Sequence, residues 1–468
     1  MTDHRQLRSA VTGQPPLTGR LEPWLAELLT DAPACADLLE RFGSPLNVID
    51  PEPLARNAAE LVATGTERGV EVRVRFARKA NKAFALVEAA LAAGHGVDVA
   101  SLAELTQVLE LGAPPDRIIL SAAVKPVALL QLAVRSGVMI SLDTTQELSI
   151  VAAIATATRQ VATVAPRVAP HQGAGIAPTR FGELAERWRD VLASGPIKGV
   201  EVAGLHVHLN GYRAQDRVVA LAECLDLVDE LVAAGHRPSM VDLGGGVPMS
   251  YLDDPAQWAS FWTAARQPHP REEITWRDRP LDSVYPYYQT PVRGDWLAAI
   301  LDAALPGTST TASSALQQRG LALQLEPGRA LLDGCGATLA TVAFVKTRSD
   351  GIPLVGLEMN RTQCRSTSDD FLVDPILIRQ SAGGEPINGF LVGAYCVEDE
   401  LILARRFTFP HGVAAGDVVA LVNTGGYLMH ILESASHQIP LALNIIKGAH
   451  SFTVDRIDST TRVEHRGG

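Results

Sequence analysis

Positive charge, cysteine and long apolar segments are all scarce in this chain. It carries 41 lysines and arginines against 52 aspartates and glutamates, which gives a formal net charge of −11 at pH 7. Because nucleic acids and anionic membranes attract basic surfaces, this deficit argues against either one as a partner. No segment approaches the roughly 18 uninterrupted apolar residues of a transmembrane helix, and the first residues lack the cationic and apolar regions of a signal peptide. We therefore expect no membrane association.

Cysteine usage indicates a reducing compartment. The five cysteines are odd in number, widely spaced and without a Cys-x-x-Cys pair: Cys35, Cys224, Cys335, Cys364 and Cys396. A disulfide framework or a zinc site needs paired or closely spaced cysteines, so we expect reduced thiols in a cytoplasmic protein. His206 and His208 could suggest metal ligands, but no acid or cysteine lies at ligand spacing beside them. We expect no metal site.

Strand-like and helix-like segments alternate along the first two thirds of the chain. Apolar, β-branched runs occupy residues 72–77, 96–99, 117–121, 138–142, 163–168, 202–207, 239–243 and 321–325. Helical stretches lie between most of them, at 83–93, 101–112, 126–136, 144–157, 181–194 and 214–235. Near-continuous apolar strands separated by helices are typical of a parallel sheet. Eight such units favour a closed (β/α)8 barrel over an open, doubly wound sheet.

The rest of the chain indicates further structural units. With 468 residues and 47% hydrophobic content, it can bury a large core and should form more than one domain. We predict an N-terminal extension (1–41), a strand (42–50) that joins a C-terminal β domain, a barrel (51–330) and that β domain (331–468), whose short alternating runs are separated by glycine and proline. An aromatic-rich insertion, 251–320, interrupts the barrel. It could form a substrate wall or pack extra helices on the rim.

Four polar motifs follow predicted strands, and the carboxyl ends of barrel strands share one face. They are Phe76-Ala77-Arg78-Lys79-Ala80-Asn81, His206-Val207-His208, Asp242-Leu243-Gly244-Gly245-Gly246 and Glu326-Pro327-Gly328-Arg329. Taken singly, a lysine is usually solvated and a glycine run is usually a tight turn. Together, an amine, an imidazole, glycine N–H groups and a carboxylate with an arginine are the groups that hold pyridoxal phosphate. The set predicts this cofactor.

The motifs resemble those of the fold-type III pyridoxal-phosphate enzymes, which include diaminopimelate, ornithine and arginine decarboxylases and, more distantly, alanine racemase. The resemblance runs from about Phe42 to the C-terminus and leaves out most of 251–320. Lys79 matches the lysine that bonds to the cofactor aldehyde in a Tyr-Ala-x-Lys-Ala-Asn motif, with Phe76 in place of the tyrosine. Lys82 fits that motif poorly. Because only a neutral amine attacks an aldehyde, we expect the pocket to lower the pKa of Lys79.

The resemblance also implies how the cofactor is held. It places His208 on the pyridine ring, Glu326 and Asp98 beside the ring, and Gly244, Gly245, Gly246, Arg329 and Tyr427 at the phosphate. A carboxylate at the pyridine nitrogen keeps it protonated, so that the ring can accept the electrons released when a bond to Cα breaks. For Asp98, a strand-end acid bound by backbone N–H groups is an alternative. We interpret His206 as structural.

The segment around Cys396 corresponds to a family loop that enters the partner subunit's active site. The resemblance therefore implies a homodimer with shared active sites, in which Cys396 protonates the carbanion left by CO2. The acid that directly follows this cysteine in the family is replaced by Val397, with Glu398 one position later. A family arginine after a Met-Asn pair is off register, at Arg365. We assign substrate contacts to Glu398 and Arg365, and we expect a substrate other than ordinary diaminopimelate.

These observations predict a pyridoxal-phosphate-dependent decarboxylase of an amino acid or an amino-acid-like metabolite, such as an intermediate of a specialised pathway. Two alternatives stay open. An amino-acid racemase needs two bases on opposite cofactor faces and usually lacks a strong acid at the pyridine nitrogen, so Glu326 counts against it. A catalytically degenerate, cofactor-binding regulator is the other alternative, and the retained Lys79 and Cys396 count against that one.

Overall fold

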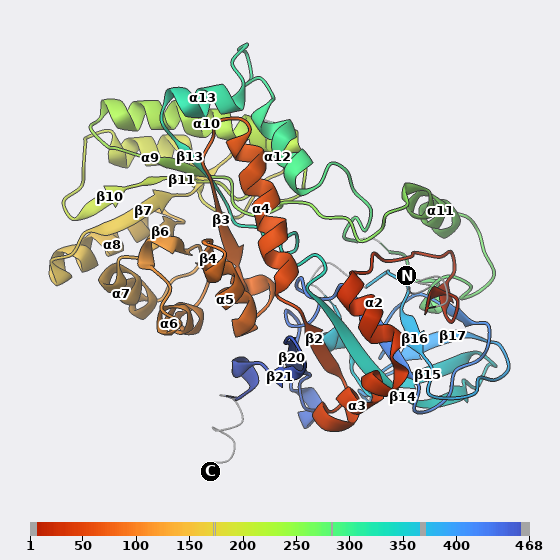
Figure 1. Cartoon of the computed structure of the whole chain (residues 1–468). Helices are drawn as coiled ribbons and strands as arrows, with labels where there is room; N and C mark the ends of the chain where they lie inside the picture. The colour runs from red at the N-terminus through yellow and green to blue at the C-terminus, as the bar shows by residue number, and fades with distance from the viewer. Residues whose placement is uncertain (1–6, 172, 174, 282–283, 366–370, 460–468) are drawn as a thin grey trace.

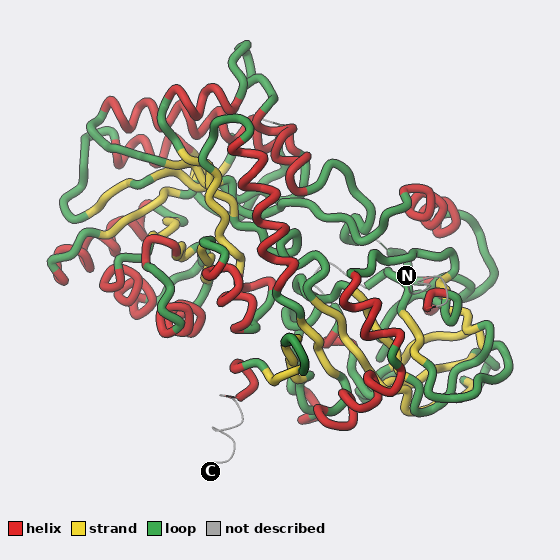
Figure 2. Tube along the Cα trace, in the orientation of Figure 1, coloured by secondary structure: helices red, strands yellow, loops and turns green. Residues whose placement is uncertain are grey.

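Two β-sheets divide the chain into two bodies that lie side by side (Figure 1). The computed structural model describes residues 7–171, 173, 175–281, 284–365 and 371–459. One body is a nine-stranded, all-parallel sheet wrapped by helices, and the other is a ten-stranded, mostly antiparallel sheet (Figure 2). The helix α4 (Glu52–Thr66) runs along the first body toward the second.

The parallel sheet is a closed barrel. Its strands are β3 (Val72–Ala77), β4 (Gly96–Val99), β5 (Ile118–Leu120), β6 (Met139–Leu142), β7 (Ala162–Pro166), β10 (Val200–Val202), β11 (Gly204–His206), β12 (Met240–Asp242) and β13 (Ala322–Leu325). The two ends of the sheet order are β10, which pairs with β7, and β11, which pairs with β12. These are consecutive halves of one stretch of chain interrupted at Ala203, so the sheet closes on itself. The predicted (β/α)8 barrel is confirmed.

Helices cover the outside of the barrel (Figure 2). They are α5 (Phe84–Ala92), α6 (Leu102–Glu110), α7 (Val127–Ser136), α8 (Thr145–Thr158), α9 (Ala185–Leu192) and α10 (Ala214–Ala233). The hydroxyl of Ser101 caps α6 by accepting from the Glu104 N–H at 3.1 Å. The helix expected from residue 181 begins later, because β9 (Glu183–Leu184) is extended and pairs with β8 (Val168–Ala169). None of the described helices is both long enough and apolar enough to cross a bilayer.

The second sheet is built around β14 (Gly336–Thr347), which pairs with β2 (Leu46–Ile49), β15 (Pro353–Leu357) and β19 (Val418–Val422). Its other strands are β1 (Thr12–Gly13), β16 (Ile376–Ile378), β17 (Ile387–Val392), β18 (Phe407–Phe409), β20 (Leu443–Lys447) and β21 (Phe452–Val454). The segment at 42–50 enters this sheet as β2, between β14 and β20. A strand that precedes the barrel in sequence thus joins the sheet that follows it.

The N-terminal extension and the barrel insertion contact each other. The extension contains β1, α2 (Pro23–Thr30) and α3 (Ala32–Phe42), and the insertion contains α11 (Pro255–Ala265), α12 (Arg293–Leu301) and α13 (Ala312–Gln318). Gly19 forms a β-bridge with Leu252, and the Arg20 N–H donates to the Tyr251 carbonyl at 2.7 Å. The extension therefore fixes the start of the insertion, which follows β12 and the glycine turn after it.

Candidate active site

A cavity of about 710 Å³ opens at the carboxyl ends of the barrel strands. Its walls come from residues that follow β3, β11, β12 and β13, and from loops at 178–181, 284–286 and 427–431. The predicted site residues that line it are Lys79, His208, Gly245, Gly246, Glu326, Arg329 and Tyr427. Barrel closure brings together groups that are far apart in the sequence, because all parallel strands end on the same face.

Lys79 is paired with Asp98. It lies in the short 3-10 helix η1 (Arg78–Ala80) directly after β3, and its Nζ is 2.6 Å from Asp98 Oδ2. Asp98 is buried on β4 and also accepts a hydrogen bond from the Ser121 hydroxyl. Burial disfavours the ammonium, but the attraction of Asp98, with smaller contributions from Tyr427 and Glu326, outweighs it and raises the pKa of Lys79. The predicted lowering is wrong for the protein groups by themselves, because the attraction of these acidic groups taken together outweighs desolvation.

Both predicted histidines sit against this pair, in different roles. His208 lines the cavity, and its ring meets Phe181 edge-on with 5.1 Å between centroids. Burial, followed by the positive charges of Lys79, Arg167, Arg217 and Arg180, lowers the pKa of His208 to about 3. His206 is fully buried, and its Nδ1 lies 2.6 Å from the Ser141 hydroxyl. A neutral His208 ring is thus available to stack against a flat ligand, while His206 is bound into the barrel interior.

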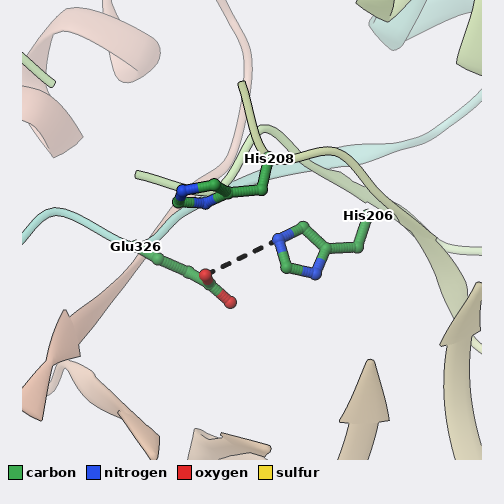
Figure 3. A group of neighbouring side chains, drawn as sticks. All are labelled: His206, His208 and Glu326. Atoms are coloured by element: carbon green, nitrogen blue, oxygen red, sulfur yellow. Dashed lines mark ion pairs between the residues drawn. The ribbon is translucent and has the colours of Figure 1, made fainter. Parts of the chain in front are cut away.

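Glu326 presents a buried carboxyl to the same space (Figure 3). Its Oε2 lies 3.6 Å from His206 Nε2, and neither carboxyl oxygen has a hydrogen-bond partner among the described residues. Burial, together with the charges of Asp98 and Asp242, raises the pKa of Glu326 well above its ordinary value. Burying a carboxyl group without hydrogen-bond partners costs free energy, and a bound ligand can remove that cost by supplying a partner. Such a group suits a ring nitrogen with which it can share a proton.

The glycine run forms a tight turn beside these groups. Gly244 and Gly246 have φ values of 64° and 76°, and the Gly244 N–H donates to Asp242 Oδ1 at 2.7 Å. A Cβ added to Gly245 would lie 3.2 Å from the Glu326 carbonyl oxygen and 3.4 Å from the His208 ring. Only glycines allow the backbone to take this path and to approach an anion with its N–H groups.

Aromatic rings position Arg329 at the same end of the cavity. Its Nη1 donates to the Tyr251 hydroxyl at 2.7 Å and to the Gly426 carbonyl at 3.3 Å. Its guanidinium carbon lies 4.1 Å from the Tyr285 ring centroid and 5.2 Å from that of Tyr427. A guanidinium oriented next to glycine N–H groups is suited to a phosphate.

Sequence reasoning missed the contributions of Tyr251 and Tyr285. Both residues belong to the insertion, and its unusually high content of aromatic residues is the sequence feature that could have indicated their role. Within the insertion, Tyr285 lines the cavity, and α12 packs on the barrel against α4 and α10. The helix α11 lies instead beside the second body, where the guanidinium carbon of Arg405 is 5.1 Å from the Phe261 ring centroid.

The three residues that were predicted to act on the substrate do not line the cavity of their own chain. Cys396 is exposed in the loop that follows β17. Glu398 lies 3.7 Å from Arg277, and its side chain is 91% exposed. Arg365 donates to the Leu401 carbonyl at 2.9 Å. Their roles toward substrate stay predictions, and within one chain the structure does not bring them to Lys79.

His206, His208 and Glu326 have the composition of a metal site, with ligand atoms within 4.8 Å of one another. The cationic groups Lys79 and Arg329 line the same cavity, however, and they favour an anionic ligand over a metal cation. Pyridoxal phosphate fits this set. It has an aldehyde for Lys79, a flat ring for His208, a ring nitrogen for Glu326, and a phosphate for the glycine turn and Arg329.

Fold and site together define a pyridoxal-phosphate-dependent barrel enzyme of fold type III. A family model described as "Pyridoxal-dependent decarboxylase, pyridoxal binding domain" matches residues 56–270. The uncharacterized protein y4yA from Sinorhizobium fredii is 34% identical, over 92% of this chain and 93% of its own. The chain belongs to the fold-type III pyridoxal-phosphate-dependent decarboxylases, which are carboxy-lyases.

Other relatives share less sequence but the same architecture. Diaminopimelate decarboxylase from Pseudomonas aeruginosa is 26% identical, over 86% of this chain and 87% of its own. The crystal structure of diaminopimelate decarboxylase from M. jannaschii in complex with L-lysine has a TM-score of 0.70 at 20% identity, over 90% of both chains. A lysine/ornithine decarboxylase from Vibrio vulnificus complexed with putrescine has a TM-score of 0.67 at 20% identity.

Proposed function

We propose that this chain removes the α-carboxylate of an amino acid or an amino-acid-like metabolite as CO2, and that it acts as a homodimer. The observation that supports this most directly is the convergence of Lys79 and Glu326 on one cavity, an amine and an acid from opposite ends of the barrel sequence. Relatives named diaminopimelate decarboxylase and lysine/ornithine decarboxylase act on amino acids, which supports the same substrate class here.

Each residue has a definable task in this reaction. When bound, pyridoxal phosphate supplies an aldehyde for the substrate amine and a ring that accepts the electrons of the broken Cα bond. Lys79 would hold the aldehyde, and Asp98 would hold the Lys79 ammonium whenever the amine is free. Glu326 would share its proton with the ring nitrogen, and the neutral His208 ring would support the ring. Gly245, Gly246 and Arg329 would bind the phosphate.

The proton returned to Cα comes, in this proposal, from Cys396 of a second copy of the chain. Cys396 is exposed, and it is not among the residues that line the cavity of its own chain. An exposed thiol on a loop can be the reacting acid only if it enters another cavity. A head-to-tail pair of chains would bring each loop to the other active site.

The substrate differs, in this proposal, from ordinary diaminopimelate. The arginine nearest to the expected carboxylate-binding position, Arg365, is directed to the Leu401 carbonyl. Glu398 lies beside Arg277, so the acid after the cysteine is partly neutralised. Both departures concern the side-chain end of the substrate, whereas Lys79, Glu326 and Arg329 keep the family pattern at the cofactor.

Absorbance and complementation test the proposal. The Lys79→Ala variant should fail to develop the visible absorbance that wild-type protein shows with pyridoxal phosphate, whereas the Lys82→Ala control should keep it. Persistence of that band in Lys79→Ala would refute the lysine assignment. Mixing inactive Lys79→Ala and Cys396→Ala chains should restore up to about a quarter of wild-type CO2 release, because half of the random dimers carry one intact site. No recovery on mixing would refute shared sites.

A further inference from the structure

We infer that Arg180 is the specificity residue for an anionic side chain of the substrate, a carboxylate at its distal end. This rests on the proposed decarboxylation and names the substrate class of that same site. Arg180 lines the 710 Å³ cavity and also a smaller cavity of about 150 Å³ that shares Lys79 and His208 with it. No sequence motif singled it out.

Among the cations that line the large cavity, Arg180 is the one without a polar partner in the described part of the chain. Lys79 is bound to Asp98, and Arg329 donates to the Tyr251 hydroxyl and the Gly426 carbonyl. Arg180 has only its ring contact, with its guanidinium carbon 4.1 Å from the Phe181 centroid. Its hydrogen-bond donors therefore remain available to a ligand.

The backbone on both sides of Arg180 is fixed, although the side chain is exposed. The Thr179 hydroxyl donates to the His208 carbonyl at 3.3 Å, and it accepts from the Phe181 N–H at 3.2 Å. The Gly182 N–H donates to Asp143 Oδ1 at 3.0 Å. A guanidinium held on a fixed segment loses less entropy on binding a carboxylate than one on a free loop.

The charge of the cavity supports an anion over an amine. Among the described residues that line it, Glu326 is the acid, and it lies at the buried end with His206. The acids in the loop that contains Cys396 already have partners within the protein. Asp399 Oδ1 is 3.2 Å from Arg277 Nη1, and Glu400 Oε1 accepts from the Arg361 N–H at 2.8 Å. A distal ammonium would find few hydrogen-bond acceptors in this cavity. A distal carboxylate could instead accept two parallel hydrogen bonds from the Arg180 guanidinium.

Three amino acids of equal reach test this inference on the cofactor-loaded protein. L-2-aminoadipate ends in a carboxylate, L-norleucine in a methyl group and L-ornithine in an ammonium, each at the same chain position. Dissociation constants from calorimetry, together with the change in cofactor absorbance, should show about tenfold tighter binding of aminoadipate than of the other two. Arg180→Gln should remove that preference, and Arg180→Lys should retain part of it.

Arg213→Gln is the matched control, because Arg213 is a nearby exposed arginine that pairs with Asp216 at 3.6 Å and does not line the cavity. It should keep the wild-type preference. Equal or weaker binding of aminoadipate would overturn the inference, and so would an equal loss of all three ligands in Arg180→Gln, which would indicate a contact to the α-carboxylate. Failure to release CO2 from any amino acid would instead overturn the proposed reaction and leave the binding preference intact.

Discussion

Lys79 Nζ lies 2.6 Å from Asp98 Oδ2, and this ion pair places the amine at the centre of the candidate site. The Lys79 side chain is 36% exposed to the cavity, whereas that of Asp98 is 1% exposed. The carboxylate is therefore the fixed partner, and the amine is the one that can move to a ligand. A raised pKa of Lys79 means that the amine is charged when it faces only the groups of the protein.

Replacing Asp98 should shift the pH at which the amine reacts. Without the carboxylate the ammonium loses its main attraction, so Asp98→Asn should lower the pKa of Lys79. The midpoint of the cofactor–lysine absorbance should then move to lower pH by about one to two units. A pH titration of that absorbance measures it, with the exposed Asp116→Asn variant as control. An unchanged or higher midpoint would contradict the pairing.

Glu326 should matter for turnover more than for cofactor binding. An amide cannot share a proton with the ring nitrogen, so Glu326→Gln should lower kcat by about 10²-fold or more. Glu326→Asp keeps the acid and should recover part of that loss. Cofactor absorbance checks that both variants stay loaded. Wild-type kcat in Glu326→Gln would show that the carboxyl is a packing group.

The Tyr251 hydroxyl should contribute to cofactor retention. Tyr251→Phe removes the acceptor that orients Arg329, and a lost hydrogen bond of about 1 kcal/mol corresponds to a roughly fivefold higher Kd for pyridoxal phosphate. Arg20→Ala should also raise this Kd, because it removes the hydrogen bonds from the extension to the Ser250 carbonyl and to Asp333, next to Tyr251. Fluorescence titration of the cofactor-free protein measures Kd. Tyr288→Phe is the control, and a wild-type Kd in Tyr251→Phe would rule out this role.

Histidine burial should make the fold sensitive to mild acid. Burial and the charge of Lys82 lower the pKa of His430 to about 3, although its bond to Asn444 opposes the shift. Between about pH 6.5 and 3 the unfolded chain binds the proton and the folded one does not, so the free energy of unfolding falls as pH falls. At pH 5 this amounts to roughly 2 kcal/mol.

The His430→Gln variant isolates this effect. Its free energy of unfolding should decline less between pH 7 and pH 5 than that of the wild type, by about 2 kcal/mol in denaturant titrations. Buried acids with a raised pKa, such as Glu326, make the free energy of unfolding rise as pH falls. Their contribution is the same in the wild type and in His430→Gln, so it cancels in the comparison. The exposed His411→Gln serves as control. Identical pH slopes for His430→Gln and wild type would contradict the assignment.

The barrel was predictable because its determinants are local. The barrel strands are short apolar runs in which nearly every residue is buried, and two of the helices between them, α6 and α8, begin at the capping residues Ser101 and Thr144. The candidate cofactor residues were predictable for the same reason. Lys79, His208, Gly245 and Glu326 each follow a strand, so strand order alone places them on one face.

What the sequence by itself determined, then, is the barrel and the residues that reach its carboxyl-end face. Only the tertiary structure decided the charge state of Lys79, the place of Arg180 and the contact of Tyr251 with Arg329. The physical reason is that pKa values and side-chain contacts depend on distances between groups that are remote in the chain, such as Asp98 to Glu326 or Arg20 to Tyr251. Those distances follow from barrel closure and from the docking of the extension, which no local pattern encodes.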